Sequence, residues 1–154
     1  MKNTQGIFNK KGFTLIEILV VIGIIAILAA IVIIAINPAR QFAQARNTER
    51  ESNVSTILNA VGQNIADNKG VFTCTGVTVG TTAVDIGTGS GLANLASCLV
   101  PTYIPSDIPA DPNGGTDTDT KYTIAVDSMG RYSVCAPQHA EAAVAGSASY
   151  CLTR

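Results

Sequence analysis

The chain has 154 residues, a formal net charge of −1 at pH 7 and no tryptophan, and this length favours one globular domain. Its charges are unevenly placed, because residues 1–12 hold three lysines and no acid, whereas residues 71–154 carry a net charge of −4. A nucleic-acid-binding head would need a basic face, so we predict no direct contact with nucleic acid.

Residues 18–36 form a run of 19 residues without a charge or a side-chain hydrogen-bonding group. As an α-helix, this run is long enough to cross a bilayer. It is too long for the core of a secretory signal, which has about 7–15 apolar residues. The basic segment at residues 1–12 should stay on the cytoplasmic side, so the chain after the run would lie across the membrane.

One carboxylate, Glu17, stands at the start of the apolar run. A carboxylate in hydrocarbon costs about 2.5 kcal/mol or more. Either Glu17 snorkels to the membrane surface, or a cation meets it at that depth and offsets the cost. A plain anchor helix has no use for this carboxylate, so we favour a cationic partner.

The sequence around Glu17 is KGFTLIE at residues 11–17. With the basic step before it and the apolar run after it, this motif resembles the class III signal of type IV prepilins and type II secretion pseudopilins. The resemblance implies that prepilin peptidase cuts between Gly12 and Phe13 and that the new amine of Phe13 is methylated. It also implies that Glu17 meets the terminal amine of a neighbouring subunit and sets the register of assembly.

Pro38 follows the apolar run and predicts a kink or a helix restart, because proline lacks a backbone donor. Many type IV pilins have a proline a few residues earlier, where this chain has Ile34. Residues 39–68 are helical and amphipathic in pattern, with a stop signal at Lys69 and Gly70. One apolar stripe should pack on a sheet. It consists of Val54, Ile57, Leu58, Val61 and Ile65.

The first turns of this amphipathic helix carry charges of both signs. They are Arg40, Arg46, Glu49, Arg50 and Glu51. A solvated helix surface is the interpretation that we favour. The alternative is contact between subunits, in which opposite charges set the register.

After Gly70 the pattern changes from helix to strand. Residues 71–74 and 76–79 are β-like, residues 87–91 predict a flexible glycine-rich loop, and residues 92–99 a short helix. The glycine-rich loop lacks the lysine and hydroxyl ending of a phosphate-binding loop.

The clearest hairpin joins residues 122–126 to residues 131–135 through a turn at residues 127–130, and residues 148–152 predict a last strand.

The expected fold is therefore α+β and type IV pilin-like, with one long N-terminal helix (about residues 14–68, kinked near Pro38) packed on a small antiparallel sheet. The expected parts are a removable leader at 1–12, a transmembrane or filament-core helix at 13–36, and a head at 37–154 with its amphipathic helix half at 39–68 and its sheet at 71–154.

All four cysteines, Cys74, Cys98, Cys135 and Cys151, follow the apolar run. An even number beyond a membrane segment predicts two disulfides in an oxidising compartment. Three pairings are possible. We favour Cys74 with Cys98 and Cys135 with Cys151, because each closes a short loop at low entropic cost.

Few residues are suited to metal binding or catalysis. The only histidine, His139, is expected in an exposed loop, and the ligand inventory disfavours zinc. Asp117 and Asp119 could offer oxygens to calcium, and the resemblance adds that major pseudopilins bind calcium in a loop of comparable position. However, no bidentate glutamate follows, and such loops are usually turns. We expect no cofactor and no enzyme activity, with calcium as the alternative.

These features predict a structural subunit that is cut by prepilin peptidase and polymerises through its N-terminal helix. Its expected partners are itself and other pilins, the peptidase and an inner-membrane assembly platform. It should cross the inner membrane once, with its head outside the cytoplasm, and then enter a surface or periplasmic filament. One alternative is a pseudopilin of type II secretion or of a competence pilus, which would act in protein secretion or DNA uptake. Another is a membrane-anchored binding domain that never polymerises.

Overall fold

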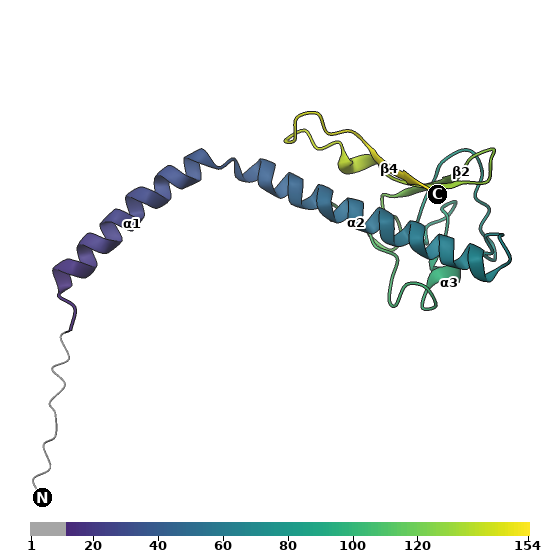
Figure 1. Ribbon diagram of the computed structural model, residues 1–154, viewed down its shortest axis with the longest axis horizontal. Helices are drawn as coiled ribbons and strands as arrows, with labels where there is room; N and C mark the ends of the chain where they lie inside the picture. Colours follow the sequence, from purple (N-terminus) through teal and green to yellow (C-terminus); the bar gives the residue numbers. More distant parts are fainter. Residues whose placement is uncertain (1–11) are drawn as a thin grey trace, which may run out of the picture. The chain divides into compact units, whose positions relative to one another are not determined.

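The computed structural model describes residues 12–154, without the side chains of residues 34 and 35. The chain divides into two compact units between Pro38 and Ala39. In the first unit, the described residues form helix α1 (Leu15–Ala35). The second unit is a head in which helix α2 (Pro38–Asp67) lies beside a small sheet (Figure 1). The expected α+β fold, with a long N-terminal helical region and an antiparallel sheet, is confirmed.

The helical region is interrupted next to Pro38. Helix α1 ends at Ala35, and its C-cap Ile36 is extended, with φ −98° and ψ 120°. Helix α2 then begins at Pro38, in the first-turn position where the missing donor and fixed φ of proline are tolerated. The predicted restart is therefore confirmed, and the expected kink is a break in the helix at Ile36 and Asn37.

The end of α2 follows the predicted stop signal. The helix ends at Asp67, and Lys69 and Gly70 adopt positive φ angles of 59° and 89°. The Gly70 N–H donates to the Ile65 carbonyl oxygen at 2.8 Å, which is the bond of a left-handed helix cap. Glycine suits this position because it adopts positive φ without a steric penalty.

The apolar stripe of α2 forms one side of the core of the head. Four of its five members are buried, with at most 2% exposure, and Ile65 is partly buried against them. Ile124 and Val134 of the sheet belong to the same cluster, as do apolar side chains from the loops between the strands. Burial of such side chains contributes about 1.5–3 kcal/mol each, so the stripe fixes α2 on the sheet.

The sheet has four antiparallel strands in the order β1 (Val84–Asp85), β2 (Thr123–Val126), β3 (Tyr132–Ala136) and β4 (Tyr150–Thr153). The predicted hairpin is confirmed as β2 and β3, with Ile124 opposite Val134. Its turn is closed by the Asp127 N–H, which donates to the Arg131 carbonyl oxygen at 2.9 Å. The last strand begins two residues later than expected and ends one residue later.

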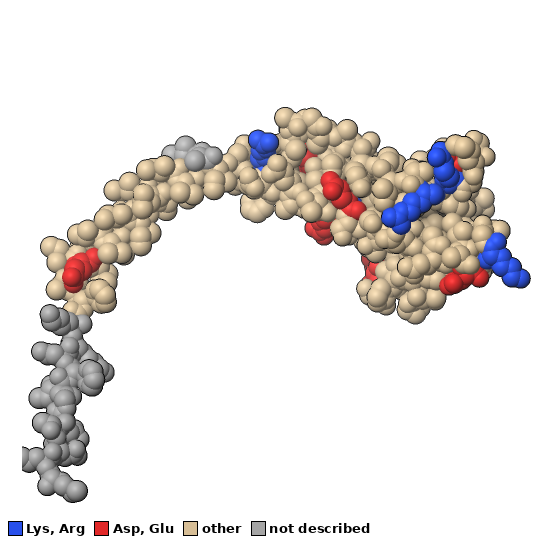
Figure 2. Space-filling model, viewed as in Figure 1, with Lys and Arg blue, Asp and Glu red and all other residues tan. Residues whose placement is uncertain are grey.

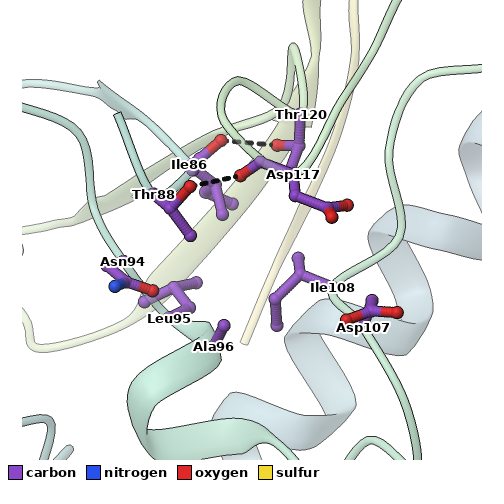
Figure 3. Close-up of a pocket in the computed structure, with 10 residues that line it drawn as sticks. Ile86, Thr88, Asn94, Leu95, Ala96, Asp107, Ile108, Asp117 and Thr120 are labelled. Carbon is purple, nitrogen blue, oxygen red and sulfur yellow. Dashed lines mark hydrogen bonds between the residues drawn. The ribbon is translucent and has the colours of Figure 1, made fainter. Parts of the chain in front are cut away.

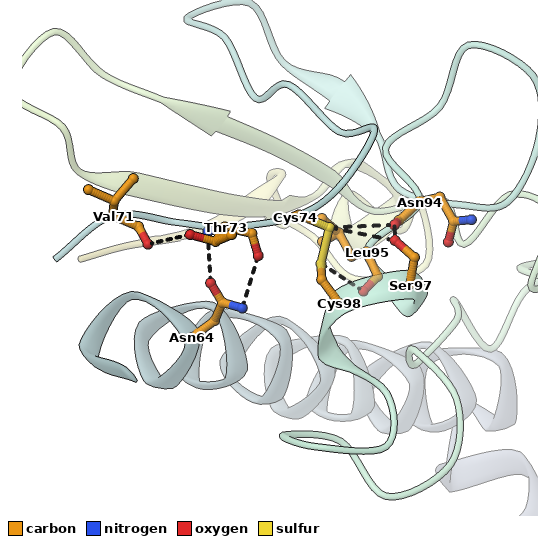
Figure 4. The surroundings of a disulfide bond; sticks show 8 residues. All are labelled: Asn64, Val71, Thr73, Cys74, Asn94, Leu95, Ser97 and Cys98. Atoms are coloured by element: carbon orange, nitrogen blue, oxygen red, sulfur yellow. Dashed lines mark hydrogen bonds between the residues drawn. A yellow bond between two sulfur atoms is a disulfide. The ribbon is translucent and has the colours of Figure 1, made fainter. Parts of the chain in front are cut away.

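The strands predicted at residues 71–74 and 76–79 are wrong, because neither segment is a strand. The Asn64 side chain of α2 instead accepts from the Thr73 N–H at 2.9 Å and donates to the Thr73 carbonyl oxygen at 3.1 Å (Figure 4). A side-chain amide thus satisfies backbone groups that a neighbouring strand would have paired. The short helix is α3 (Ala96–Leu99), four residues shorter at its start than expected.

Backbone hydrogen bonds join the glycine-rich loop at residues 87–91 to the segment at Asp117 and Thr118, and its flexibility stays a prediction. The backbone N–H of Thr88 donates to the Asp117 carbonyl oxygen, and that of Gly89 to the Thr118 carbonyl oxygen, each at 2.9 Å. A Cβ atom at Gly87 would lie 2.2 Å from the Thr118 carbonyl oxygen. Glycine is required there because the two backbones approach so closely.

Candidate functional site: the exposed helix and its N-terminal end

The start of α1 is a capping box built by Thr14 and Glu17. The Thr14 side-chain oxygen Oγ1 accepts from the Glu17 N–H at 3.2 Å. In return, Glu17 Oε2 accepts from the Thr14 N–H at 2.7 Å and from the Thr14 hydroxyl at 2.8 Å. Sequence reasoning did not identify Thr14, although a threonine followed three residues later by glutamate is a known start signal.

The predicted processing residues lie directly before this box. Gly12 and Phe13 are outside the helix and exposed, with 85% of Phe13 accessible. Glu17 is also exposed, in the first turn of α1. The basic step at Lys10 and Lys11, and the rest of the leader before Gly12, lie outside the described residues. The structure therefore places the bond between Gly12 and Phe13 in an accessible, non-helical stretch.

From Leu15 to Ile33, helix α1 is exposed along its apolar surface, and the face drawn in Figure 2 carries no charged residue beyond the first turn. Residues Leu15–Ile33 form a 19-residue candidate membrane span with no part buried. The exposed fractions of its leucine, isoleucine and valine side chains run from 49% at Val21 to 83% at Leu15. By length and composition, a surface of this kind is consistent with membrane anchoring.

Two disulfides lie in the head. Cys74 pairs with Cys98, which fastens the segment after α2 to α3 (Figure 4). Cys135 pairs with Cys151, and these two residues lie opposite each other on β3 and β4. Each disulfide thus closes a short loop, which costs less conformational entropy than closing a long one.

A buried ionic network centred on Arg50 was not predicted. The Arg50 guanidinium is fully buried and donates to both Asp111 carboxylate oxygens at 2.6 and 2.9 Å. It also donates to Asn47 Oδ1 at 2.9 Å and to Glu141 Oε1 at 2.7 Å. Arg46 donates to both Glu141 oxygens at 2.7 and 3.0 Å. The expected solvated surface is therefore wrong for Arg50, whereas the Arg46 side chain is paired but stays 32% exposed.

The charges of this network stabilise one another. Hydrogen bonds from Arg46 and then Arg50 lower the pKa of Glu141 to about 2. The bonds to Asp111 raise the pKa of Arg50. Because these donors and acceptors meet within the head, the network joins α2 to the loop at Asp111 and to the segment after β3. The network therefore connects three segments that are far apart in the sequence.

The expectation that His139 is exposed is also wrong. His139 ends a short 3₁₀ helix (Pro137–His139), and only 15% of its side chain is accessible. Its Nδ1 lies 2.8 Å from the Ala148 carbonyl oxygen, and its Nε2 lies 3.1 Å from Glu51 Oε1 on α2. The ring therefore fastens the segment between β3 and β4 to α2.

The predicted calcium residues do not converge on a metal site. The Asp119 carboxylate accepts from the Lys121 ammonium group and from the Lys121 N–H, the latter at 3.0 Å. Asp117 lies beside a pocket, and its backbone carbonyl accepts from the Thr88 hydroxyl at 3.2 Å (Figure 3). Over residues 12–154, no three histidine, cysteine or acidic side chains come together to hold a metal. Calcium takes about 6–8 oxygen ligands, which can include backbone carbonyls and water, so calcium binding at Asp117 and Asp119 stays a prediction.

A comparison with protein families identifies residues 7–36 as a prokaryotic N-terminal methylation motif. This motif is the class III signal of type IV pilins and pseudopilins. No curated protein and no solved structure matches the chain. The motif spans the exposed start of α1 and the apolar helix itself, and it supports a precursor of the type IV pilin-like or pseudopilin class.

Proposed function

We propose that this chain is a prepilin, the precursor of a structural subunit that polymerises through α1 into a type IV pilus-like filament. One observation carries the proposal. A 19-residue apolar helix is wholly exposed, and it begins with a single carboxylate inside a methylation motif. A soluble monomer has no place for such a surface, whereas a bilayer and then a bundle of identical helices would cover it.

The first step is processing by prepilin peptidase between Gly12 and Phe13. Water adds to the Gly12 carbonyl carbon, the C–N bond breaks, and the cut leaves a carboxylate on Gly12 and an amine on Phe13. Methylation of this amine keeps it basic, as methylation of a lysine does. The mature chain therefore starts with a cation four residues before Glu17.

Before assembly, α1 would span the inner membrane. The three lysines of residues 1–12 hold the leader in the cytoplasm, and the head lies on the other side. The two disulfides of the head fit this orientation, because disulfides persist in oxidising compartments. The assembly platform of the inner membrane would then transfer the subunit from lipid to the filament.

In the filament, the Glu17 carboxylate would meet the Phe13 amine of a neighbouring subunit. Two unit charges 4 Å apart attract by about 4 kcal/mol at an effective dielectric constant of 20. A carboxylate in hydrocarbon costs about 2.5 kcal/mol or more, so the two terms are of the same order. The pair therefore offsets the burial of Glu17 only in the correct register, and heads remain outside the bundle on the cell surface or in the periplasm.

The substitution Glu17→Gln tests this assembly role. Glutamine can replace glutamate in a capping box, so the change removes the charge and keeps the helix start. We expect the variant to be cut and inserted in the membrane, and to be lost from filaments at least tenfold. Asp107→Asn, at an exposed carboxylate of the head, is the matched control and should assemble normally. Normal filament yield from Glu17→Gln would contradict the proposal.

A further inference from the structure

The capping box fixes where the helix starts relative to the proposed cut. Thr14 is extended, with φ −82° and ψ 153°, and its carbonyl oxygen accepts the first helical bond, from the Ile18 N–H at 3.3 Å. The helix therefore begins at Leu15. Two residues, Phe13 and Thr14, separate the bond after Gly12 from the first helical residue.

A helix that started one turn earlier would protect this bond. The Gly12 carbonyl would then accept from the Ile16 N–H, and neighbouring side chains would cover it. An apolar environment favours such an extension, because each backbone donor or acceptor without a partner in hydrocarbon costs several kcal/mol. The stop signal must therefore lie in the sequence, and the reciprocal bonds between Thr14 and Glu17 supply it.

We propose that Thr14 is a positioning residue for cleavage: by capping α1 it keeps the bond between Gly12 and Phe13 in extended chain, accessible to the peptidase. This inference rests on the proposed processing between Gly12 and Phe13. Thr14 acts through the helix start, not by contact with the reacting atoms. A change at Thr14 should alter the fraction of precursor that presents the bond, and therefore the cleavage rate.

The capping box is compatible with the later role of Glu17. Both bonds from Thr14 end on the same carboxylate oxygen, Oε2. The other oxygen, Oε1, can receive a cation from a neighbouring subunit without loss of the cap. Both residues also lie on the mature side of the cut, so the box survives cleavage. Glu17 therefore serves the helix start in the precursor and can serve register in the filament.

Cleavage kinetics of the full-length chain in lipid bilayers, with purified prepilin peptidase, test the inference. Thr14→Val has the same shape but no capping hydroxyl. Loss of a cap costs about 1 kcal/mol of helix stability, so we expect kcat/KM to fall by up to about fivefold. Thr14→Ser and Thr14→Asn are good caps of different shapes and should stay within about twofold of wild type.

Each possible result decides the question. Cleavage of Thr14→Val at the wild-type rate would overturn the inference. Slow cleavage of Thr14→Asn together with wild-type cleavage of Thr14→Ser would also overturn it, because that result would show that the peptidase recognises the hydroxyl directly. The carbon chemical shifts of Gly12 and Phe13 give a second readout. In Thr14→Val they should move towards helical values, and unchanged shifts would contradict the proposal that Thr14 stops the helix. If the wild-type chain is not cut after Gly12, the proposed function itself fails, which is a different result.

Discussion

The head buries most of its apolar surface, whereas helix α1 leaves its apolar surface exposed. The head buries its own core between α2 and the sheet, closes two loops with disulfides, and neutralises its buried arginine with its own acids. Helix α1 buries none of its 19-residue apolar span. One part of the chain is thus stable by its own contacts, and the other depends on lipid or on other subunits.

This difference explains how one chain could be stable both in a bilayer and in a filament. In the proposed assembly, a self-contained head need not change when the helix passes from bilayer to filament. The helix would exchange lipid for neighbouring helices because its surface is apolar, and the proposed pair of Glu17 with a Phe13 amine would direct it. Mutations in the head should therefore change stability, whereas mutations at Phe13, Thr14 or Glu17 should change processing and assembly.

The largest effect on the head should come from Arg50→Ala. The change leaves the buried Asp111 carboxylate without its cation, and we expect a loss of about 3–5 kcal/mol in the free energy of unfolding. Urea unfolding of the full-length protein in detergent measures it. Arg131→Ala, which removes an exposed pair with Asp127, is the control and should change stability by about 1 kcal/mol or less. Equal losses in the two variants would show that the buried network does not hold the head.

The next largest effect should follow removal of the disulfide between β3 and β4. The double variant Cys135→Ser, Cys151→Ser should lose about 2–4 kcal/mol, because the unfolded chain regains the freedom of the closed loop. Membrane insertion of α1 should be unchanged, as measured by its resistance to alkaline extraction. A variant that leaves the membrane would contradict the independence of the two parts.

Acid should weaken the head through Glu141. Its pKa in the folded head is about 2, below the ordinary value of 4.5. Its contribution is therefore fully present above pH 4.5 and is lost as pH falls towards 2. We expect Glu141→Gln to lose about 1–3 kcal/mol at pH 7 and to show a smaller further loss on acidification. The free energy of unfolding, measured between pH 7 and pH 2, checks this; parallel curves for wild type and variant would rule it out.

The smallest expected change in stability comes from replacing glycines in α1 and α2, and it should differ between the two helices. Gly62 lies inside α2, and a Cβ atom there would meet nothing within 4 Å. Gly62→Ala should stabilise the head by about 0.5–1 kcal/mol, because alanine is the better helix former. Gly23→Ala in α1 also meets open space and should leave the unfolding of the head unchanged. An equal gain from both changes, in the same urea experiment, would show that the helix and the head unfold together.

The features that sequence reasoning predicted are those coded by neighbouring residues. The length of the uncharged run predicted the apolar helix, and periodicity predicted the buried stripe of α2. Pro38 predicted the restart, and the turn at residues 127–130 predicted the hairpin. The motif at residues 11–17 identified the signal that the family comparison also finds. Each of these signals acts over a few residues, where propensity and period are reliable.

The features that were missed depend on distant partners. Arg50 bonds to residues 61 and 91 positions further along the chain, so its burial has no local pattern. The same is true of His139, whose ring reaches Glu51 from 88 positions away. Residues 71–74 have a strand-like composition, but Asn64 occupies the backbone groups of Thr73. Tertiary contacts override local propensity in all three places.

We propose that the mature chain assembles through α1 once the cut has removed residues 1–12. Mass spectrometry of filaments sheared from cells tests it most directly. We predict an N-terminal peptide that begins at methylated Phe13, from a chain that retains all of α1. A sheared filament fraction without this chain, or one that contains it with residues 1–12 still attached and Phe13 unmethylated, would contradict the account.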